Sequence, residues 1–333
     1  MSTPLLELDG LRITLPTKRG RAAVVDGVDL VLGEGEIVGV AGESGCGKTM
    51  TALSLMQLLP RRAQTEGRAL FRGRDLLRLG GREIRKVRGG EIGVVFQDPM
   101  SSLHPMFNIE RQLTEHMRSH LGIKGAAARA RAIDLLGRVR IPDPEAALGA
   151  YPHQFSGGMR QRIAVAMALA CGPRLLIADE PTTALDVTVQ AGILRLLDSF
   201  RGETGLSVLL ISHDLAVISA VADRLYVFYA GRVVEAGDAS PLLATPRHPY
   251  THALLRALPH PERRAELLLP IPGSPPRPGE LPDGCVFHPR CSFVKPQCIA
   301  DRPVLTQIAA GRLAACPVDP LGAVTVEAAQ EAG

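Results

Sequence analysis

Residues 42–49 read Gly42-Glu-Ser-Gly-Cys-Gly-Lys-Thr49, and this stretch decides the fold. It has the spacing of a glycine, four variable residues, and then Gly-Lys followed by Ser or Thr. The apolar run Ile37–Ala41 precedes it, and a segment of helical composition follows. In such a loop the glycines let consecutive backbone N–H groups point into one concavity, and the next helix adds the positive end of its dipole. The stretch therefore predicts a phosphate-binding loop between a strand and a helix.

Within this loop, Lys48 is expected to bridge the β- and γ-phosphates of ATP, and Thr49 is expected to hold Mg2+. The residues predicted to surround the nucleotide are Gly42, Glu43, Ser44, Gly45, Cys46, Gly47, Lys48, Thr49 and Met50. The alternative is a glycine-rich turn that binds nothing. Flanking strand and helix signals make this alternative weak.

An acidic pair, Asp179-Glu180, ends the apolar run Leu175–Ala178. One strand end can place Asp179 beside a Mg2+ ion and turn Glu180 toward the water that attacks a γ-phosphate. Taken alone, the run could equally be a strand that ends in a charged turn. The phosphate loop elsewhere in the chain favours the catalytic interpretation.

Composition limits the classes of protein that are possible. The chain has 333 residues, of which 46% are hydrophobic and 22% charged, as in a folded globular protein. A net charge of +4 is too small to argue for nucleic acid by itself. The longest apolar stretch, Ile163–Gly172, is too short to span a bilayer, and the N-terminus lacks the pattern of a signal peptide. We therefore expect a cytosolic chain.

The order of the elements predicts an α/β fold. Short apolar runs alternate with segments of helical spacing, which is typical of a largely parallel sheet covered on both faces. These runs are 36–41, 92–96, 175–178, 208–211 and 225–228. Residues 100–155 have no comparable run, so we expect a helical insertion within a subdomain of about 100–170.

Proline usage divides the chain near residue 240, because 16 of its 26 prolines lie in residues 241–320. We therefore predict a first domain at 1–240, a small irregular C-terminal extension at 241–320 and a frayed tail at 321–333. Such a proline-rich extension is expected to bury little core and to need a staple.

A further motif, Phe155-Ser-Gly-Gly-Met159, precedes a helical segment that begins near Ile163. With this motif the chain resembles the ATP-binding cassette family, whose signature is a Ser-Gly-Gly at the start of a helix. The resemblance covers residues 5–240. Its ordered elements are the phosphate loop, Gln97, the signature, Asp179-Glu180, Ala184-Leu-Asp186 and Ser212-His-Asp214. It implies a P-loop cassette built on a mixed, largely parallel sheet.

The resemblance also implies roles for single residues. Two such subunits sandwich two ATP molecules, so Ser156, Gly157 and Gly158 would face the γ-phosphate at the other subunit's loop. Gln97 would ligate Mg2+ or position water, and His213 would contact the γ-phosphate and hold the attacking water with Glu180. Asp186 would run along the seam between the subunits. The catalytic residues expected on this basis are Glu180, His213 and Gln97, and the Mg2+ ligands are Thr49, Gln97 and Asp179.

Longer stretches are similar to the D-type ATPase of bacterial oligopeptide and dipeptide importers. They are 96–105, 151–162, 178–190 and 247–255. This resemblance implies that the chain forms a heterodimer with a second cassette ATPase. It also implies two membrane permeases and an extracytoplasmic substrate-binding protein as partners, and no nucleic acid. The chain would be a peripheral protein on the cytoplasmic face of the inner membrane. Related branches import nickel, glutathione or antimicrobial peptides, and this sequence does not choose among these substrates.

Two other classes of function are alternatives. Cassette ATPases of DNA repair or translation usually carry long coiled coils, zinc hooks or two cassettes, and this sequence shows none of these. A small-molecule P-loop kinase would lack the Ser-Gly-Gly signature and His213. The transport ATPase is therefore the leading hypothesis.

Two departures from the family pattern concern the nucleotide. Cassettes usually stack the adenine on an aromatic residue before the phosphate loop, but residues 1–70 contain no Phe, Tyr or Trp. An aliphatic side chain or an arginine between Leu15 and Val24 is expected to cover the base instead. The signature also ends in Met159 where Gln is commonest, although its Ser-Gly-Gly is intact.

Four of the six cysteines lie in the C-terminal extension, namely Cys285, Cys291, Cys298 and Cys316. Four thiolates can bind zinc or a 4Fe–4S cluster. The gaps of five, six and seventeen residues exceed those usual in zinc knuckles, and the D-type resemblance also implies a cluster. We expect 4Fe–4S, with zinc and unligated or oxidised thiols as the alternatives. Cys46 and Cys171 are expected to be structural.

A basic segment lies between Pro60 and Gly90, where ten Lys and Arg stand against three acidic residues. A solvated face is the simplest interpretation. Contact with lipid head groups or an acidic partner is the alternative.

Overall fold

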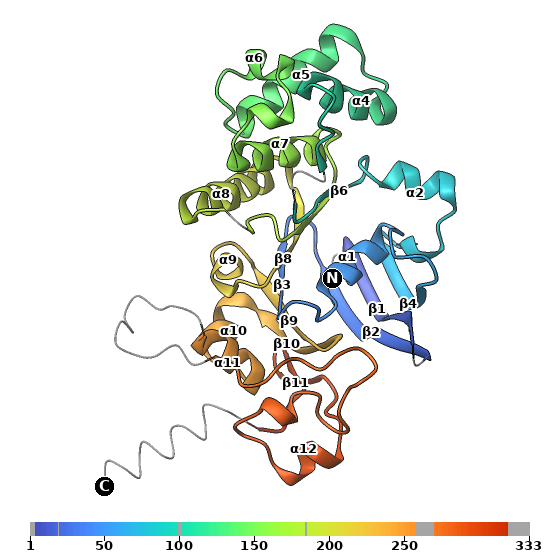
Figure 1. The fold of residues 1–333 in the computed structure, drawn as a ribbon, viewed down its shortest axis with the longest axis vertical. Helices are drawn as coiled ribbons and strands as arrows, with labels where there is room; N and C mark the ends of the chain where they lie inside the picture. The colour runs from blue at the N-terminus through green and yellow to red at the C-terminus, as the bar shows by residue number, and fades with distance from the viewer. Residues whose placement is uncertain (1–3, 19, 99–101, 184, 258–269, 319–333) are drawn as a thin grey trace. The chain divides into compact units, whose positions relative to one another are not determined.

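The computed structural model describes residues 4–18, 20–98, 102–183, 185–257 and 270–318, and the tail predicted to be frayed lies outside these ranges. The chain forms two compact units, which are drawn in Figure 1. The first consists of residues 1–5, 32–37 and 78–211, and the second of residues 6–31, 38–77 and 212–333.

The first unit contains three parallel strands in the order β8-β7-β6. Their bounds are β6 (Ile92–Val95), β7 (Leu175–Asp179) and β8 (Ser207–Ser212). Residue Leu175 pairs with Ile92 on one side and with Ser207 on the other. Every residue of β7 and β8 is buried, as expected for apolar runs of a parallel sheet that is covered on both faces. The sequence runs thus predicted the strands to within two residues.

The other main elements described in the first unit are helices. They are α2 (Gly81–Val87), α4 (Ile109–Leu121), α5 (Gly125–Arg138), α6 (Pro144–Gly149), α7 (Gly157–Leu169) and α8 (Val187–Thr204). Asn108 caps α4 by accepting a hydrogen bond from the N–H of Arg111. Leu113 and Met117, one turn apart on α4, are fully buried. The described part of 102–169 therefore folds as a helical region.

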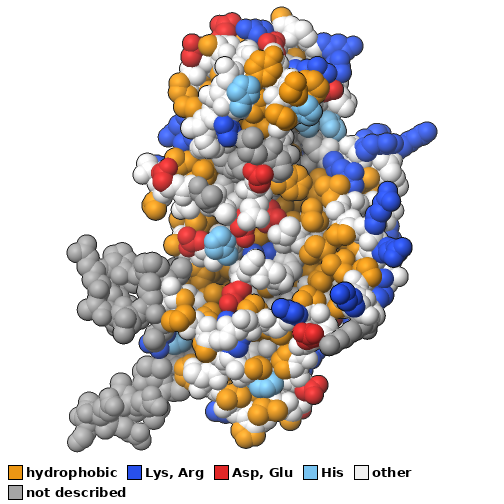
Figure 2. All heavy atoms as spheres, viewed as in Figure 1, with side chains coloured by type: hydrophobic (Ala, Val, Ile, Leu, Met, Phe, Trp, Pro, Cys, Tyr) orange, Lys and Arg blue, Asp and Glu red, His pale blue; other side chains and the backbone are white. Residues whose placement is uncertain are grey.

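Short α2 belongs to the predicted basic segment. Its Arg82, Arg85 and Lys86 are exposed, while Ile84 and Val87 are buried. Figure 2 shows Lys and Arg side chains projecting from the surface that α2 occupies in Figure 1. A solvated basic face agrees with this arrangement.

The second unit begins with an antiparallel sheet that the sequence analysis did not predict. Its strand order is β2-β1-β4-β5, with β1 (Leu6–Thr17), β2 (Gly20–Leu32), β4 (Gln64–Phe71) and β5 (Arg74–Asp75). Strand β1 pairs with β4 from Leu6–Phe71 to Thr14–Gln64, and the register shifts between Asp9 and Arg12. A signal for β1 was present, because Leu6 and Leu8, and then Leu11 and Ile13, alternate with polar residues. The register shift between Asp9 and Arg12 interrupts that alternation.

A second sheet of this unit carries the phosphate loop. Its strands run in the order β3-β9-β10-β12-β11, with β3 (Ile37–Ala41), β9 (Arg224–Tyr229), β10 (Arg232–Asp238), β11 (Thr306–Ala309) and β12 (Arg312–Ala314). Strands β3 and β9 are parallel, and the other pairs are antiparallel. Helices α1 (Lys48–Leu55), α9 (Leu215–Ser219), α10 (Ala239–Ala244) and α11 (Pro249–Arg256) complete this part. A Cβ at Gly39 would lie 2.4 Å from Cγ2 of Ile218, so the glycine lets α9 approach β3 closely.

The expectation that the C-terminal extension buries little core is wrong for its described residues. Strand β12 pairs with β10, with Ala314 opposite Glu235. Phe287 is 2% exposed and packs against Tyr229 and Tyr250, at ring-centroid distances of 5.2 and 5.3 Å. Sheet pairing and an aromatic cluster therefore fix residues that the proline content suggested would need a staple. A short helix, α12 (Pro296–Ala300), also lies in this segment.

Among the described residues, no helix has the length and apolar character needed to cross a membrane.

Candidate active site

The phosphate loop follows β3 and leads into α1 within the second unit. Helix α1 begins after Gly47, whose φ is 106° and which has no side chain to cap the helix, and a helix start of this kind is favourable for binding an anion. A Cβ at Gly42 would lie 2.2 Å from the carbonyl O of Phe228, and one at Gly47 would lie 2.6 Å from the carbonyl O of Val24. Glycine is therefore required at both positions by close backbone packing.

Lys48 lies inside this loop and is 4% exposed. Its Nζ donates hydrogen bonds to the carbonyl O of Gly42 at 2.6 Å and to that of Glu43 at 3.0 Å. The ammonium group is thus held by loop carbonyls at the start of α1, where a phosphate would compete for it. Buried Cys46 lies beside it, with Sγ 3.7 Å from Nζ. Burial raises the pKa of the Cys46 thiol, so this thiol stays neutral.

The first unit brings two predicted catalytic residues together. Nε2 of Gln97 donates a hydrogen bond of 2.8 Å to Oε2 of Glu180, and Oγ1 of Thr183 donates one of 2.9 Å to the same oxygen. Backbone N–H of Glu180 donates to the carbonyl O of Ile211 at 2.8 Å. Glu180 has a φ of 50°, which is uncommon for a residue with a side chain. Strained backbone of this kind clusters at functional sites.

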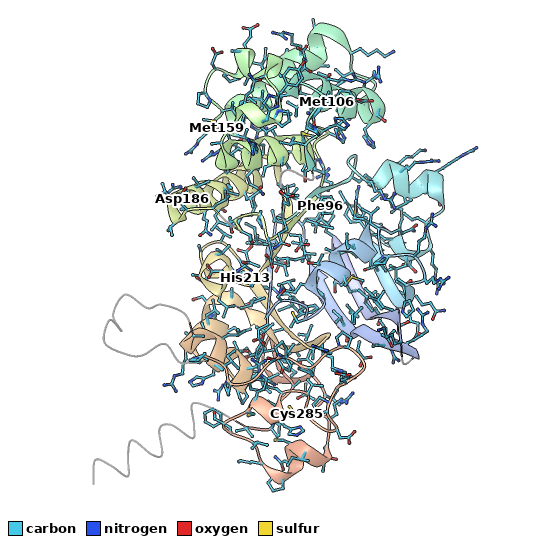
Figure 3. The ribbon with its side chains drawn as sticks, in the orientation of Figure 1. Phe96, Met106, Met159, Asp186, His213 and Cys285 are labelled. Carbon is cyan, nitrogen blue, oxygen red and sulfur yellow. The ribbon has the colours of Figure 1, made fainter. Side chains whose placement is uncertain are left out.

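The predicted Mg2+ ligand Asp179 and the third predicted catalytic residue, His213, lie at strand ends. Asp179 is the last residue of β7 and is 4% exposed. His213 follows β8 directly and is exposed (Figure 3). Asp179, Glu180 and Gln97 belong to the first unit, whereas His213 and the phosphate loop belong to the second.

Each signature residue lies at a helix start, as predicted. Ser156 is the N-cap of α7 and its Oγ accepts a hydrogen bond of 3.3 Å from the N–H of Met159. A Cβ at Gly158 would lie 2.9 Å from Cγ1 of Val189, so this glycine allows α7 and α8 to approach. Asp186 caps α8 through a 2.9 Å hydrogen bond from the N–H of Val189 (Figure 3). Both helix starts are exposed.

The cluster predicted for the four cysteines of the C-terminal extension is not supported by the structure. This extension, residues 241–320, is called the tail from here on. Among the described residues, no three His, Cys, Asp or Glu side chains are arranged to hold a metal ion. Two of the sulfurs accept hydrogen bonds from backbone amides, Sγ of Cys291 from Phe293 N–H and Sγ of Cys316 from Val318 N–H. Burial, together with neighbouring thiols, raises the pKa of Cys316 to about 12, so this group is a neutral thiol here. All six cysteines are free.

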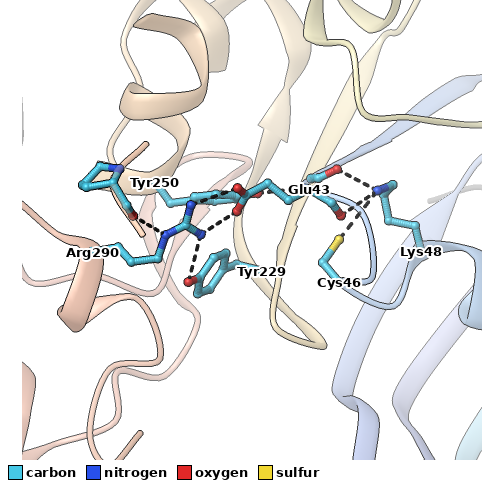
Figure 4. Close-up of polar contacts among 8 residues, drawn as sticks. Glu43, Cys46, Lys48, Tyr229, Tyr250 and Arg290 are labelled. Carbon is cyan, nitrogen blue, oxygen red and sulfur yellow. Dashed lines mark hydrogen bonds and ion pairs between the residues drawn. The ribbon is translucent and has the colours of Figure 1, made fainter. Parts of the chain in front are cut away.

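The sequence analysis missed a set of residues that contact the phosphate loop. Arg290 of the tail forms an ion pair with Glu43 at 2.7 Å, and the hydroxyl of Tyr250 accepts a 2.8 Å hydrogen bond from Glu43 N–H (Figure 4). Arg290 is 247 residues from Glu43 in the chain, and no short motif links them.

A glycine-rich phosphate loop before a helix, with an acidic pair at a strand end, defines a P-loop nucleotide-hydrolysing protein. Comparison with known proteins agrees. Residues 25–183 match the ABC transporter family model, and residues 234–298 match that of the oligopeptide/dipeptide transporter C-terminal region. The chain belongs to the ATP-binding cassette transporter ATPases, in the branch that carries this C-terminal region.

Relatives align along nearly the whole chain. A peptide import ATP-binding protein of Brucella abortus is 46% identical over 317 residues, which are 95% of each chain. The dipeptide transport ATP-binding protein DppD of Escherichia coli is 44% identical, covering 97% of this chain and 99% of the relative. The sequence-based assignment to a transport ATPase is confirmed.

Solved structures confirm the α/β cassette fold. An ATP-binding cassette in a post-hydrolysis state with ADP and Pi has a TM-score of 0.63 and 28% identity, and covers 70% of this chain and 98% of its own. The cassette cbiO1 of Clostridium perfringens, part of an ABC transporter complex, has a TM-score of 0.62 and 26% identity, and covers 73% of this chain and 92% of its own. None of the reported comparisons supports a role in DNA repair or translation.

Proposed function

We propose that this chain is the ATP-hydrolysing subunit of an importer for dipeptides or oligopeptides. One observation carries the proposal: relatives named for peptide import align with both the cassette and the C-terminal region, over 95% of the chain. The substrate itself is selected by other subunits, so the proposal names a class of substrate and no single peptide.

In the proposed reaction, Lys48 leaves the carbonyls of Gly42 and Glu43 and pairs with the β- and γ-phosphates. Glu180 accepts a proton from water as the water oxygen bonds to the γ-phosphorus, and the bond to the bridging oxygen breaks to give ADP and phosphate. The 2.8 Å hydrogen bond from Gln97 supports this role, because it restricts the direction of the carboxylate. His213 is proposed to contact the γ-phosphate.

The chain also offers suitable ligands for Mg2+. Oxygen donors suit this ion, and Thr49, Asp179 and the amide oxygen of Gln97 would hold it, since Gln97 uses its Nε2 for Glu180. When bound, Mg2+ offsets the charge of the β- and γ-phosphates.

A second ATPase and two permeases are the proposed partners, with an extracytoplasmic substrate-binding protein. Ser156, Gly157 and Gly158 would complete the ATP site of the second ATPase, and Asp186 would lie along the seam. The exposed start of α7 supports this, because it presents backbone N–H groups and a hydroxyl in the way that suits a phosphate. The protein would act at the cytoplasmic face of the inner membrane.

Two finer proposals concern the tail. We place the domain boundary near residue 240, with the extension at 241–320. The four tail cysteines are proposed to take up a 4Fe–4S cluster, with zinc as the alternative. Their donor chemistry supports this, since Cys285 N–H is bonded to Cys298 O and backbone amides point at the sulfurs of Cys291 and Cys316. Its role would be structural, and no step of hydrolysis passes through it.

Coexpression with the permeases and the binding protein that neighbouring genes are expected to encode tests the proposed function. The chain should co-purify with the permeases and a second ATPase, and its ATP hydrolysis should rise when the binding protein carries a peptide. Failure to associate with any permease would contradict the proposal. Iron, sulfide and zinc analysis of anaerobically purified protein tests the metal, and protein free of all three would exclude it.

A further inference from the structure

Glu43 has three polar groups, and each contacts a different part of the second unit (Figure 4). Its carbonyl O accepts a hydrogen bond of 3.0 Å from Lys48 Nζ. Its N–H donates one of 2.8 Å to the hydroxyl of Tyr250 on α11. Its carboxylate pairs with Arg290 of the tail. Glu43 therefore connects the phosphate-binding lysine to elements far along the chain.

The Arg290–Glu43 pair is bidentate and largely buried. Nη1 donates to Oε2 at 2.7 Å, and Nη2 donates to Oε1 at 2.9 Å. The two side chains are 5% and 24% exposed. Burial works against the charge of Arg290, but hydrogen bonds with Glu43 and Tyr229 outweigh it and raise its pKa. Pairs of this geometry combine strength with directional specificity.

Further contacts hold the guanidinium in one orientation. Nε donates to the carbonyl O of Pro272 at 2.8 Å, and Nη1 also donates to the hydroxyl of Tyr229 at 3.3 Å. The rings of Tyr229, Tyr250 and Phe287 form the aromatic cluster beside it. Because Arg290 is fixed on every side, it can fix Glu43 in turn.

A second contact places the tail against strand β2. A Cβ at Gly279 would lie 3.2 Å from Cβ of Ala22 on β2. The tail therefore approaches this unit at Glu43 and at β2. Arg290 immediately precedes Cys291, so the contact at Glu43 is one residue from a proposed metal ligand.

We propose that Arg290 is a positioning residue that holds the phosphate loop through Glu43, so that folding of the tail and binding of ATP are thermodynamically linked. The inference rests on the proposed ATP site. A loop already fixed in its binding conformation loses less conformational freedom when ATP binds. Linkage is reciprocal, so ATP also stabilises the tail.

Equilibrium binding of ATP and Mg2+ to the purified full chain tests the inference. Arg290→Gln and Glu43→Gln should each raise the Kd for ATP about 10-fold, because a charged bidentate pair becomes weaker and less directional. Arg290→Lys should give a smaller loss of ATP affinity than Arg290→Gln, because the ammonium keeps the positive charge although it cannot make the bidentate contact. The double variant should bind within about 2-fold of either single variant, because both remove the same interaction.

Arg302→Gln is the matched control. Arg302 lies in the same tail but donates only to the tail carbonyls of Gly284 and Pro282 among its hydrogen bonds in the structure. Its Kd for ATP should stay within about 2-fold of the unsubstituted chain. ATP should also slow trypsin cleavage of the tail in the unsubstituted chain, and this protection should be reduced in Arg290→Gln. A purely structural role would not give this effect.

The outcomes separate the inference from the proposed function. If Lys48→Ala loses ATP binding while the Arg290 and Glu43 variants bind ATP normally, the inference is wrong and the ATP site stands. If the unsubstituted chain binds ATP no better than Lys48→Ala, the proposed function fails first. Should Arg290→Gln not fold, Glu43→Gln decides, because it keeps the shape of the side chain. Additive effects in the double variant would also overturn the inference.

Discussion

The amide Nε2 of Gln97 lies 2.8 Å from Oε2 of Glu180, and this hydrogen bond joins two residues that are 83 positions apart. Glu180 adopts a φ of 50° at the same place. A carboxylate held by Gln97 and Thr183 on a strained backbone has few directions open to it. Both features agree with a group that must face one attacking water.

The substitution Glu180→Gln should keep ATP binding and lose turnover by at least about 100-fold, because the amide cannot accept the proton of the attacking water. Steady-state phosphate release by the assembled transporter measures turnover, and equilibrium binding measures affinity. Glu115→Gln, which changes an exposed glutamate of α4, is the control. Hydrolysis within a few-fold of the unsubstituted protein would remove Glu180 from the catalytic role.

The substitution Ser156→Arg should impair the partner ATPase and leave ATP binding at this chain's own loop intact, because the signature is proposed to act across the seam. Ser156 also caps α7, so its loss costs about 1 kcal/mol of stability. Ser156→Asn keeps a capping oxygen and separates that cost from the effect of a bulky cation. Photolabelling of each subunit with an ATP analogue is the measurement. Undisturbed closure and hydrolysis at the partner's site would show that the assignment is wrong.

The substitution Gly39→Ala should destabilise the fold by about 1–3 kcal/mol, because its Cβ would lie 2.4 Å from Cγ2 of buried Ile218. Gly149→Ala is the control, since a Cβ there has no neighbour within 4 Å. Urea unfolding of both variants gives the comparison. Equal urea midpoints for the two variants would mean that α9 can move away from β3 without a loss of stability.

The sequence predicted the parts of the fold that local chemistry determines. The loop 42–49 and the buried strands β7 and β8 depend on glycine geometry and apolar runs, which are visible in a short window. Helix starts at Ser156 and Asp186 also coincide with motif positions. These elements carry most of the proposed chemistry.

Long-range pairing was not predictable in the same way. Strand β12 pairs with β10 although Ala314 lies 79 positions after its partner Glu235, and a proline count gave no sign of this pairing. Likewise, Arg290 reads as one more basic residue until the fold brings it to Glu43. The tail cysteines show the opposite case, since their spacing predicted a metal site, whereas no three metal-binding side chains are grouped to hold an ion among the described residues.

His248 gives a prediction about pH. Its ring is buried, and burial lowers its pKa to about 3 from an ordinary value of 6.5. Nδ1 accepts a 3.1 Å hydrogen bond from the N–H of Tyr250 and so caps α11 in the neutral form. The backbone N–H of His248 donates a hydrogen bond of 3.0 Å to Oε2 of Glu235, and Glu235 pairs with Arg312, so the backbone of His248 is held beside an ion pair.

Below pH 6.5 the unfolded chain protonates His248 while the folded chain does not, down to about pH 3. The unfolded state then binds more protons, so stability falls as the pH falls through this window and is fully present above it. Between pH 7 and pH 5 the loss of stability from this one group should be about 2 kcal/mol.

The substitution His248→Asn keeps a capping oxygen and lowers stability through lost ring packing. It should also flatten the slope of stability against pH. His153→Asn, which changes an exposed histidine, should leave the slope unchanged. Urea unfolding at a series of pH values measures the slopes, and an unaltered slope in His248→Asn would mean that other groups cause the acid sensitivity.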